Sequence, residues 1–223
     1  GGVLAYSRGG EDAKSTLFEA DRTGKVTGPA LASGQVVNPR LSPDGRRLLF
    51  EMGGTINEGN EIWVRDLERS TQTKLVFGSG SARMPLWSPD GQRFACVQVP
   101  PTGPSRILIG SADGLGARDS INATDALPPM LTDWTKATGQ LLVVPGSFQN
   151  LLVATPDSAD KLLRPFPGVG AGFIAQAVLS PDGRWLAYAS TDGGTNPQVY
   201  VISLSGTPGR WQISTQGGYM PVW

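Results

Sequence analysis

The chain has 223 residues and equal numbers of basic and acidic side chains, 19 of each, so bulk charge predicts neither a nucleic-acid partner nor an anionic membrane surface. It contains no histidine, which excludes Ser-His-Asp and Cys-His catalysis. Its one cysteine, Cys96, can form neither an internal disulfide nor a zinc cage, and is expected to be a small buried apolar residue. Thirty glycines and 18 prolines are typical of a turn-rich β protein, and no apolar run approaches the ~20 residues of a membrane-spanning helix.

The first predicted strand is VLAYS at residues 3–7, and the first strong turn signal is LSPDG at 41–45. In such a turn proline fixes φ, Asp44 accepts hydrogen bonds from the nearby backbone, and Gly45 adopts the positive φ that closes a hairpin. A metal or acid/base role for the aspartate is the alternative, and the turn chemistry makes it unnecessary. Strands are predicted next at 47–52, 61–67 and 74–77.

The same turn returns twice as SPDG, with Asp90 and Gly91 and then with Asp182 and Gly183, and once in the altered form DWTKATG at 133–139. The residues before these turns are Leu41, Trp87, Trp134 and Leu179, so the spacings are 46, 47 and 45. After the last turn, strands are predicted at 185–190, 198–204, 210–214 and 219–223. A period of about 45 residues with four short strands is typical of a propeller blade.

We therefore predict an all-β fold, a β-propeller of four-stranded antiparallel blades, with residues 1–223 as one domain of five repeat lengths. Residues 3–7 align with 185–189, and MPVW at 220–223 repeats MPLW at 84–87. We expect segments 1–32 and 219–223 to share one blade and close the ring, with Trp223 as buried as Trp87, because an open ring exposes strand edges. A piece of a six-bladed ring is the alternative.

Several segments in chain order carry a resemblance to a known family: GVLAY, ADRTGK, NPRLSPDG, EIWVRDL, TDW, RPFP, LSPDGRWLAY and, most specific, RWQISTQGGYMPVW at 210–223. The chain resembles the TolB-like (WD-type) β-propeller family, and within it the propeller attached to bacterial serine/threonine protein kinases. The altered third turn departs from the family pattern, and many such rings have six blades. The resemblance implies a non-catalytic domain without cofactor or metal, beside a kinase or similar signalling domain.

Three functions follow from this interpretation. The favoured one is a sensor or interaction module that binds a small molecule, a peptide or a protein at the propeller face. The alternatives are a propeller that gates a hydrolase of prolyl-oligopeptidase type, and a pure scaffold. The favoured location is the extracytoplasmic, periplasmic side of a bacterial membrane-anchored protein, without direct membrane insertion.

The predicted binding residues come from equivalent positions of the repeat, at the mouth of the expected channel. The first set stands three residues before the residue that precedes each turn, and before Trp223 at the end of the last repeat: Asn38, Met84, Leu131, Gln176 and Met220. The second set stands one position earlier: Val37, Arg83, Met130, Ala175 and Tyr219. We expect Arg83 to anchor an anion or carbonyl, Asn38 and Gln176 to hydrogen-bond, Tyr219 to form an aromatic wall, and Met84 and Met220 to adapt to the ligand. The alternative is that these residues only pack the neck of the ring.

Overall fold

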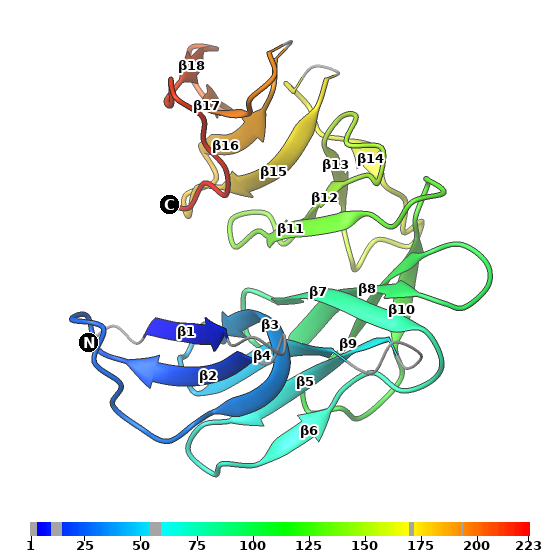
Figure 1. Cartoon of the computed structure of the whole chain (residues 1–223). Coiled ribbons are helices and arrows are strands. Elements are labelled where there is room, and N and C mark those ends of the chain that lie inside the picture. The colour runs from blue at the N-terminus through cyan, green and yellow to red at the C-terminus, as the bar shows by residue number, and fades with distance from the viewer. Residues whose placement is uncertain (1–3, 10–14, 54–58, 170–171, 193) are drawn as a thin grey trace. The chain divides into compact units, whose positions relative to one another are not determined.

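A computed structural model describes residues 4–9, 15–53, 59–169, 172–192 and 194–223 (Figure 1). Within these residues every regular element is a strand, and none forms a helix long and apolar enough to cross a membrane. The strands are β1 (Leu4–Gly9), β2 (Ser15–Ala20), β3 (Ala32–Leu41), β4 (Arg47–Gly53), β5 (Asn60–Asp66), β6 (Gln72–Lys74), β7 (Ser81–Trp87), β8 (Arg93–Val99), β9 (Arg106–Ser111), β10 (Asp119–Asn122), β11 (Met130–Trp134), β12 (Leu141–Val144), β13 (Leu152–Ala154), β14 (Arg164–Pro165), β15 (Ile174–Leu179), β16 (Trp185–Ser190), β17 (Gln198–Ser203) and β18 (Arg210–Gln212).

The strands form antiparallel sheets in which sequence neighbours pair. Three sheets have four strands, in the orders β10-β9-β8-β7, β11-β12-β13-β14 and β15-β16-β17-β18. The sheet β1-β2-β3-β4-β5-β6 has six, because the long strand β3 pairs through its first residues with β2 and through its later residues with β4. The predicted meander of short strands is therefore confirmed, and β3 joins the first repeat to the second.

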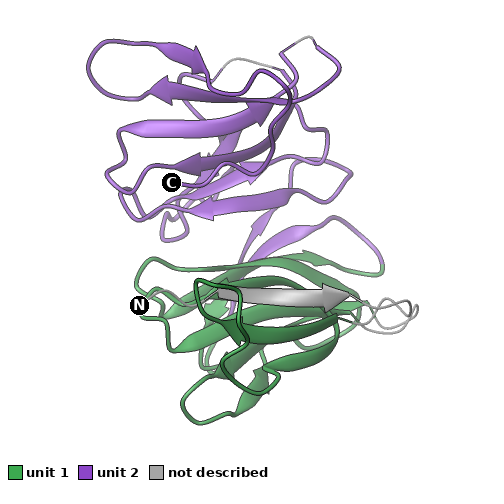
Figure 2. Ribbon diagram, turned by 60° about the vertical axis from the view of Figure 1, so that its left-hand side comes forward, with its two compact units in different colours: residues 1–101, 110–117 green, residues 102–109, 118–223 purple. Residues whose placement is uncertain are grey.

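The chain divides into two compact units, residues 1–101 with 110–117 and residues 102–109 with 118–223 (Figure 2). The first unit has an apolar core over β2, β3 and β4, with Leu17, Val36 and Phe50 fully or nearly fully buried. In the second unit the sheets β11–β14 and β15–β18 share a core to which Leu142 and Leu186 contribute. The strands that follow the turns, β4, β8, β12 and β16, are buried along most of their length, so both of their faces are covered.

The SPDG segments fold as predicted. Gly45, Gly91 and Gly183 have φ values of 73°, 71° and 72°. The same hydrogen bonds recur in each turn: the serine hydroxyl donates to the aspartate, the glycine N–H donates to the serine carbonyl, and the N–H one residue after the glycine donates to the aspartate. The three aspartates are therefore engaged as turn residues.

The altered third turn keeps the same plan with one more residue. Thr135 replaces the serine, and its N–H donates to the carbonyl of Gln140 over 2.8 Å. The hydroxyl of Thr138 lies 2.5 Å from that of Thr135, so a second hydroxyl takes the place of the aspartate. Gly139 again has a positive φ, of 68°. A threonine pair therefore substitutes for the missing SPD motif.

Two expected strands differ from the structure. The strand expected at 74–77 is β6, which lies at Gln72–Lys74. Residues 219–223 form no strand, and no described residue pairs with them as β8 pairs with β7. The expectation that Trp223 is buried is also wrong, because it is 53% exposed whereas Trp87 is 8% exposed. Cys96 is buried as expected. Val3, which belongs to the expected shared blade, lies outside the described residues.

Trp223 nevertheless makes the contact that its repeat position predicts. Its indole N–H donates to the carbonyl of Val178 over 3.2 Å, and the indole N–H of Trp87 donates to the carbonyl of Arg40 over 2.8 Å. Val178 and Arg40 both stand two residues before the serine of an SPDG turn. Trp87 and Trp223 therefore share this hydrogen bond but differ in burial.

The turns make the stability of the protein sensitive to acid. The pKa values of Asp44, Asp90 and Asp182 are held below the ordinary value of 3.8, first by the serine hydroxyl of the turn and then by a backbone N–H. A lowered pKa in the folded state adds stability above the pKa of the unfolded chain, and this is lost as the pH falls through the folded pKa. We expect urea unfolding to show a larger loss of stability between about pH 7 and pH 3 for the wild type than for the triple Asp→Asn variant, which keeps an acceptor oxygen in each turn. Equal losses would contradict this role.

Candidate functional site

Two of the predicted binding positions, Asn38 and Met84, lie at bulges in strands that precede the SPDG turns. In β3 the residues Asn38 and Pro39 stand opposite Phe50 alone, because the pairing passes from Val37 to Arg40. In β7 the pair Met84 and Pro85 interrupts the pairing in the same way, between Arg83 and Leu86. Proline has no N–H to give to a ladder, so an X-Pro pair inside a strand is accommodated at a bulge.

The residue before each of these prolines has an uncommon backbone conformation. Asn38, Met84 and Met220 have φ values of 51°, 55° and 52°, in the left-handed region that most side chains avoid. All three occupy the same position of the repeat and precede a proline. Their common conformation agrees with the alignment of these three positions by the repeat, and in β3 and β7 it interrupts the regular alternation of the strand at Asn38 and Met84.

A buried carboxylate joins the two bulges of the first unit. Glu51 in β4 is only 3% exposed. Its Oε2 accepts a hydrogen bond of 2.9 Å from Nδ2 of Asn38 and one of 3.1 Å from the backbone N–H of Met84. Its Oε1 accepts a hydrogen bond from Nδ2 of Asn60. Glu51 thus holds β3, β5 and β7 together through three N–H donors, as a buried carboxylate must be satisfied.

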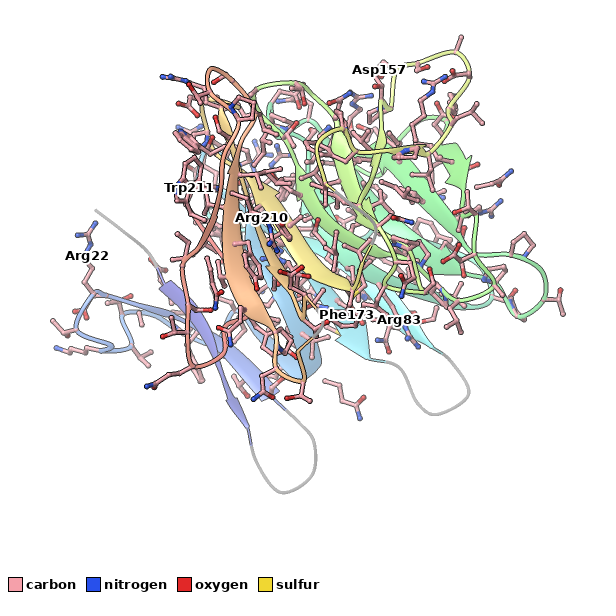
Figure 3. The ribbon with its side chains drawn as sticks, turned by 90° about the horizontal axis from the view of Figure 1, so that it is seen from above. Arg22, Arg83, Asp157, Phe173, Arg210 and Trp211 are labelled. Carbon is pink, nitrogen blue, oxygen red and sulfur yellow. The ribbon has the colours of Figure 1, made fainter. Side chains whose placement is uncertain are left out.

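Arg83 extends this cluster toward solvent. Its Nε donates to Oγ of Ser81 over 3.1 Å, and the same oxygen accepts the backbone N–H of Asn60 over 3.1 Å. The Arg83 side chain is exposed (labelled in Figure 3), and it makes no ion pair with any residue in the described ranges. Nε is bonded to Ser81, and within the described part of the chain the two terminal nitrogens of the guanidinium have no acceptor, so they can bind one supplied by a ligand.

A groove of about 630 Å³ adjoins the cluster at Ser81. It is lined by Gly59, Glu61, residues 78–81 and Pro101. At its edge Glu61 forms an ion pair with Lys74 and accepts the indole N–H of Trp63 over 2.9 Å. The groove therefore offers space and hydrogen-bonding groups beside Arg83, within the same unit.

The other residues expected to contact a ligand, Gln176, Tyr219 and Met220, belong to the second unit. Gln176 is half-buried in β15 and pairs with Ala189. Tyr219 and Met220 are 62% and 72% exposed, and Leu131 is buried. The structure thus brings Asn38, Arg83 and Met84 together, whereas the convergence of all the predicted residues on one channel mouth stays a prediction.

Sequence reasoning missed Glu51, Asn60 and Ser81. One signal was available for Glu51, which stands nine residues after Ser42. The residues nine places after Ser88 and Ser180 are Val97 and Ala189. A carboxylate at a strand position that is apolar in the other SPDG repeats is unexpected, because buried strand positions are usually apolar. It indicates a role in hydrogen bonding and not in apolar packing. Asn60 and Ser81 have no comparable signal, because their contacts depend on the loops that place them.

No protein-family model matches the chain. Among solved structures it is similar to TolB from Acinetobacter baumannii (TM-score 0.70, 18% identity, 98% of this chain and 54% of that one). It is also similar to a putative TolB from Agrobacterium tumefaciens (TM-score 0.66, 20% identity, 86% and 68%). A Bacillus subtilis protein named as the uncharacterized peptidase YuxL is 23% identical over 170 residues, which are 74% of this chain and 24% of that protein.

The chain thus spans about half the length of the first TolB structure and about a quarter of the Bacillus protein. The antiparallel four-stranded sheets, the repeated turns and the structural similarity agree with one another. The chain therefore has the fold of a TolB-like β-propeller built from four-stranded antiparallel blades.

Proposed function

We propose that the chain is a non-catalytic binding propeller, a sensor or interaction domain that accompanies a bacterial signalling kinase on the extracytoplasmic side. The observation that carries the proposal is the cluster in which Glu51 fixes Asn38 and Met84 beside the exposed Arg83. The kinase association and the location rest on the sequence resemblance, in particular on residues 210–223.

The backbone of the cluster supports a binding role over simple packing. A non-glycine residue in the left-handed region costs about 1–2 kcal/mol, and such residues persist where the surroundings hold them in place. Asn38 and Met84 both have this conformation, and both bond to the same oxygen of Glu51. Polar groups fixed in this way on strands lose little entropy when a ligand binds.

A peptide selection tests the proposal. A random peptide library displayed on phage is selected on the immobilised chain, and the affinities of the enriched peptides are measured by fluorescence anisotropy. We expect Arg83→Ala to weaken their binding by about tenfold or more, since arginines that bind an acceptor are common hot spots worth about 1.4 kcal/mol or more.

Arg46→Ala is the matched control. Arg46 is an exposed arginine of the first unit that pairs with Glu68 in a turn, away from the cluster, and its replacement should leave the peptide affinity unchanged. Enriched peptides that bind Arg83→Ala as tightly as the wild type, or a selection without enrichment, would refute the proposed site.

A propeller that gates a hydrolase is the second candidate. It is supported by the similarity to the Bacillus protein named as a peptidase, of which this chain would cover only a part. Since the chain contains no histidine, the catalytic triad of such an enzyme would have to reside in another domain. The full-length gene distinguishes the candidates: a kinase domain beside the propeller supports the first, and a hydrolase domain with a GxSxG motif supports the second.

A further inference from the structure

We infer that Glu51 fixes the orientation of the Asn38 carboxamide, so that the site binds an extended peptide backbone, whose N–H donates to Oδ1 of Asn38 and whose carbonyl or terminal carboxylate accepts from Arg83. This inference rests on the proposed binding function and specifies its ligand class. In it Glu51 is a positioning residue and Asn38 and Arg83 contact the ligand.

The orientation of Asn38 follows from the atoms that surround Glu51. A backbone N–H can only donate, so the contact with Met84 makes Oε2 of Glu51 an acceptor. Asn38 bonds to this same oxygen and must therefore present its NH₂ group to it. The carbonyl oxygen of the Asn38 side chain is then directed away from Glu51. Since Asn38 is exposed, this oxygen is available as an acceptor.

Arg83 supplies the complementary chemistry. A guanidinium has only donors, and its Nε is bound to Ser81, so its terminal nitrogens can bind only an acceptor. Arg83 directly precedes Met84, whose N–H shares Oε2 of Glu51 with Asn38. The cluster thus offers one acceptor on Asn38, which is bonded to Glu51, and a pair of donors on Arg83, which is bonded to Ser81. A peptide backbone presents the matching donor and acceptor, and the adjoining groove of about 630 Å³ has room for it.

A pair of capped peptides tests the donor requirement. The probe is acetyl-dialanine N-methylamide, and the comparison is its analogue with every amide nitrogen methylated, which keeps the carbonyls and removes the N–H groups. Binding is followed through the ¹H–¹⁵N chemical shifts of the chain. We expect the probe to shift the signals of Asn38, Arg83 and Met84, and the methylated analogue to bind about tenfold more weakly, as expected for one lost hydrogen bond.

Two variants of Glu51 test its positioning role. Glu51→Val introduces the residue found at the equivalent position of the next repeat, Val97, and should remove the preference for the unmethylated probe while the chain stays folded by circular dichroism. Glu51→Gln should keep the preference, since the amide oxygen still accepts from Met84 and Asn38 and only Asn60 has to turn its carboxamide. The side-chain NH₂ signals of Asn38 should move in Glu51→Val and stay in place in Glu51→Gln.

The outcomes separate the two proposals. Equal binding of the two peptides, or an unchanged preference in Glu51→Val, overturns the inference about Asn38 and leaves the binding site standing. If neither peptide shifts the signals of Asn38, Arg83 and Met84, the binding site itself is refuted, and the inference with it. Should Glu51→Val prove unfolded, an altered position of the Asn38 NH₂ signals in Glu51→Gln would overturn the inference.

Discussion

Gly183→Ala is expected to lower the free energy of unfolding by about 2–4 kcal/mol, combining backbone strain with overpacking. The φ value of 72° costs an L residue about 1–2 kcal/mol. In addition, a Cβ on Gly183 would lie 2.6 Å from Cβ of Ala137, in the altered third turn. Because Ala137 has no flexible side chain to move aside, one of the two turns must shift. The difference is measured by urea unfolding.

The other turn glycines are the matched controls. Gly45 has nearly the same φ, but a Cβ there meets no atom within 4 Å, so Gly45→Ala should cost only the backbone strain. A Cβ on Gly91 would lie 3.3 Å from Cδ of Pro43. The loss of stability in Gly91→Ala should therefore lie between the losses in Gly45→Ala and Gly183→Ala. Equal losses at the three positions would mean that successive turns do not pack as described. No loss at any of them would refute the turn conformation.

Trp87→Ala should destabilise the protein by about 3–5 kcal/mol, the range for a large buried aromatic side chain. Trp87 is nearly buried, donates to the carbonyl of Arg40, and has the guanidinium of Arg47 4.9 Å from its ring centre. Trp223 makes the equivalent hydrogen bond to Val178 but is about half exposed. We therefore expect Trp223→Ala to cost only about 1 kcal/mol, from the hydrogen bond and partial burial.

Thermal unfolding of the two variants under the same conditions compares these costs. An equal loss of stability would contradict the exposure of Trp223 and would indicate that residues 219–223 pair with another strand, as ring closure requires. A negligible effect of Trp87→Ala would contradict its place in the core of the first unit. The comparison therefore also tests the closure predicted from the repeat.

The repeat made much of the fold predictable because local chemistry specifies it. SPDG turns fold through bonds within six residues, and the strands after them are short apolar runs, as strands buried on both faces require. The altered turn at 135–139 was recognisable from its spacing, although it lacks proline and aspartate. The positions of Asn38 and Met84 were predictable for the same reason, since the repeat aligns them.

The site could be predicted only in part because its bonds join distant segments. Glu51 contacts Met84 across 33 residues, and Asn60 and Ser81 meet across 21. No local pattern encodes such contacts. The strand expected at residues 219–223 is absent from the structure for a related reason. A strand exists only when a partner strand completes its ladder, and the sequence of the segment itself carries no information about that partner.

Chemical-shift mapping of a selected peptide on the ¹⁵N-labelled chain tests the binding site most directly. The largest changes should occur at Asn38, Glu51, Asn60, Arg83 and Met84, and they should disappear in Arg83→Ala. Changes confined to β17 and the edge strand β18, with none in the cluster around Glu51, would contradict the site proposed for this propeller.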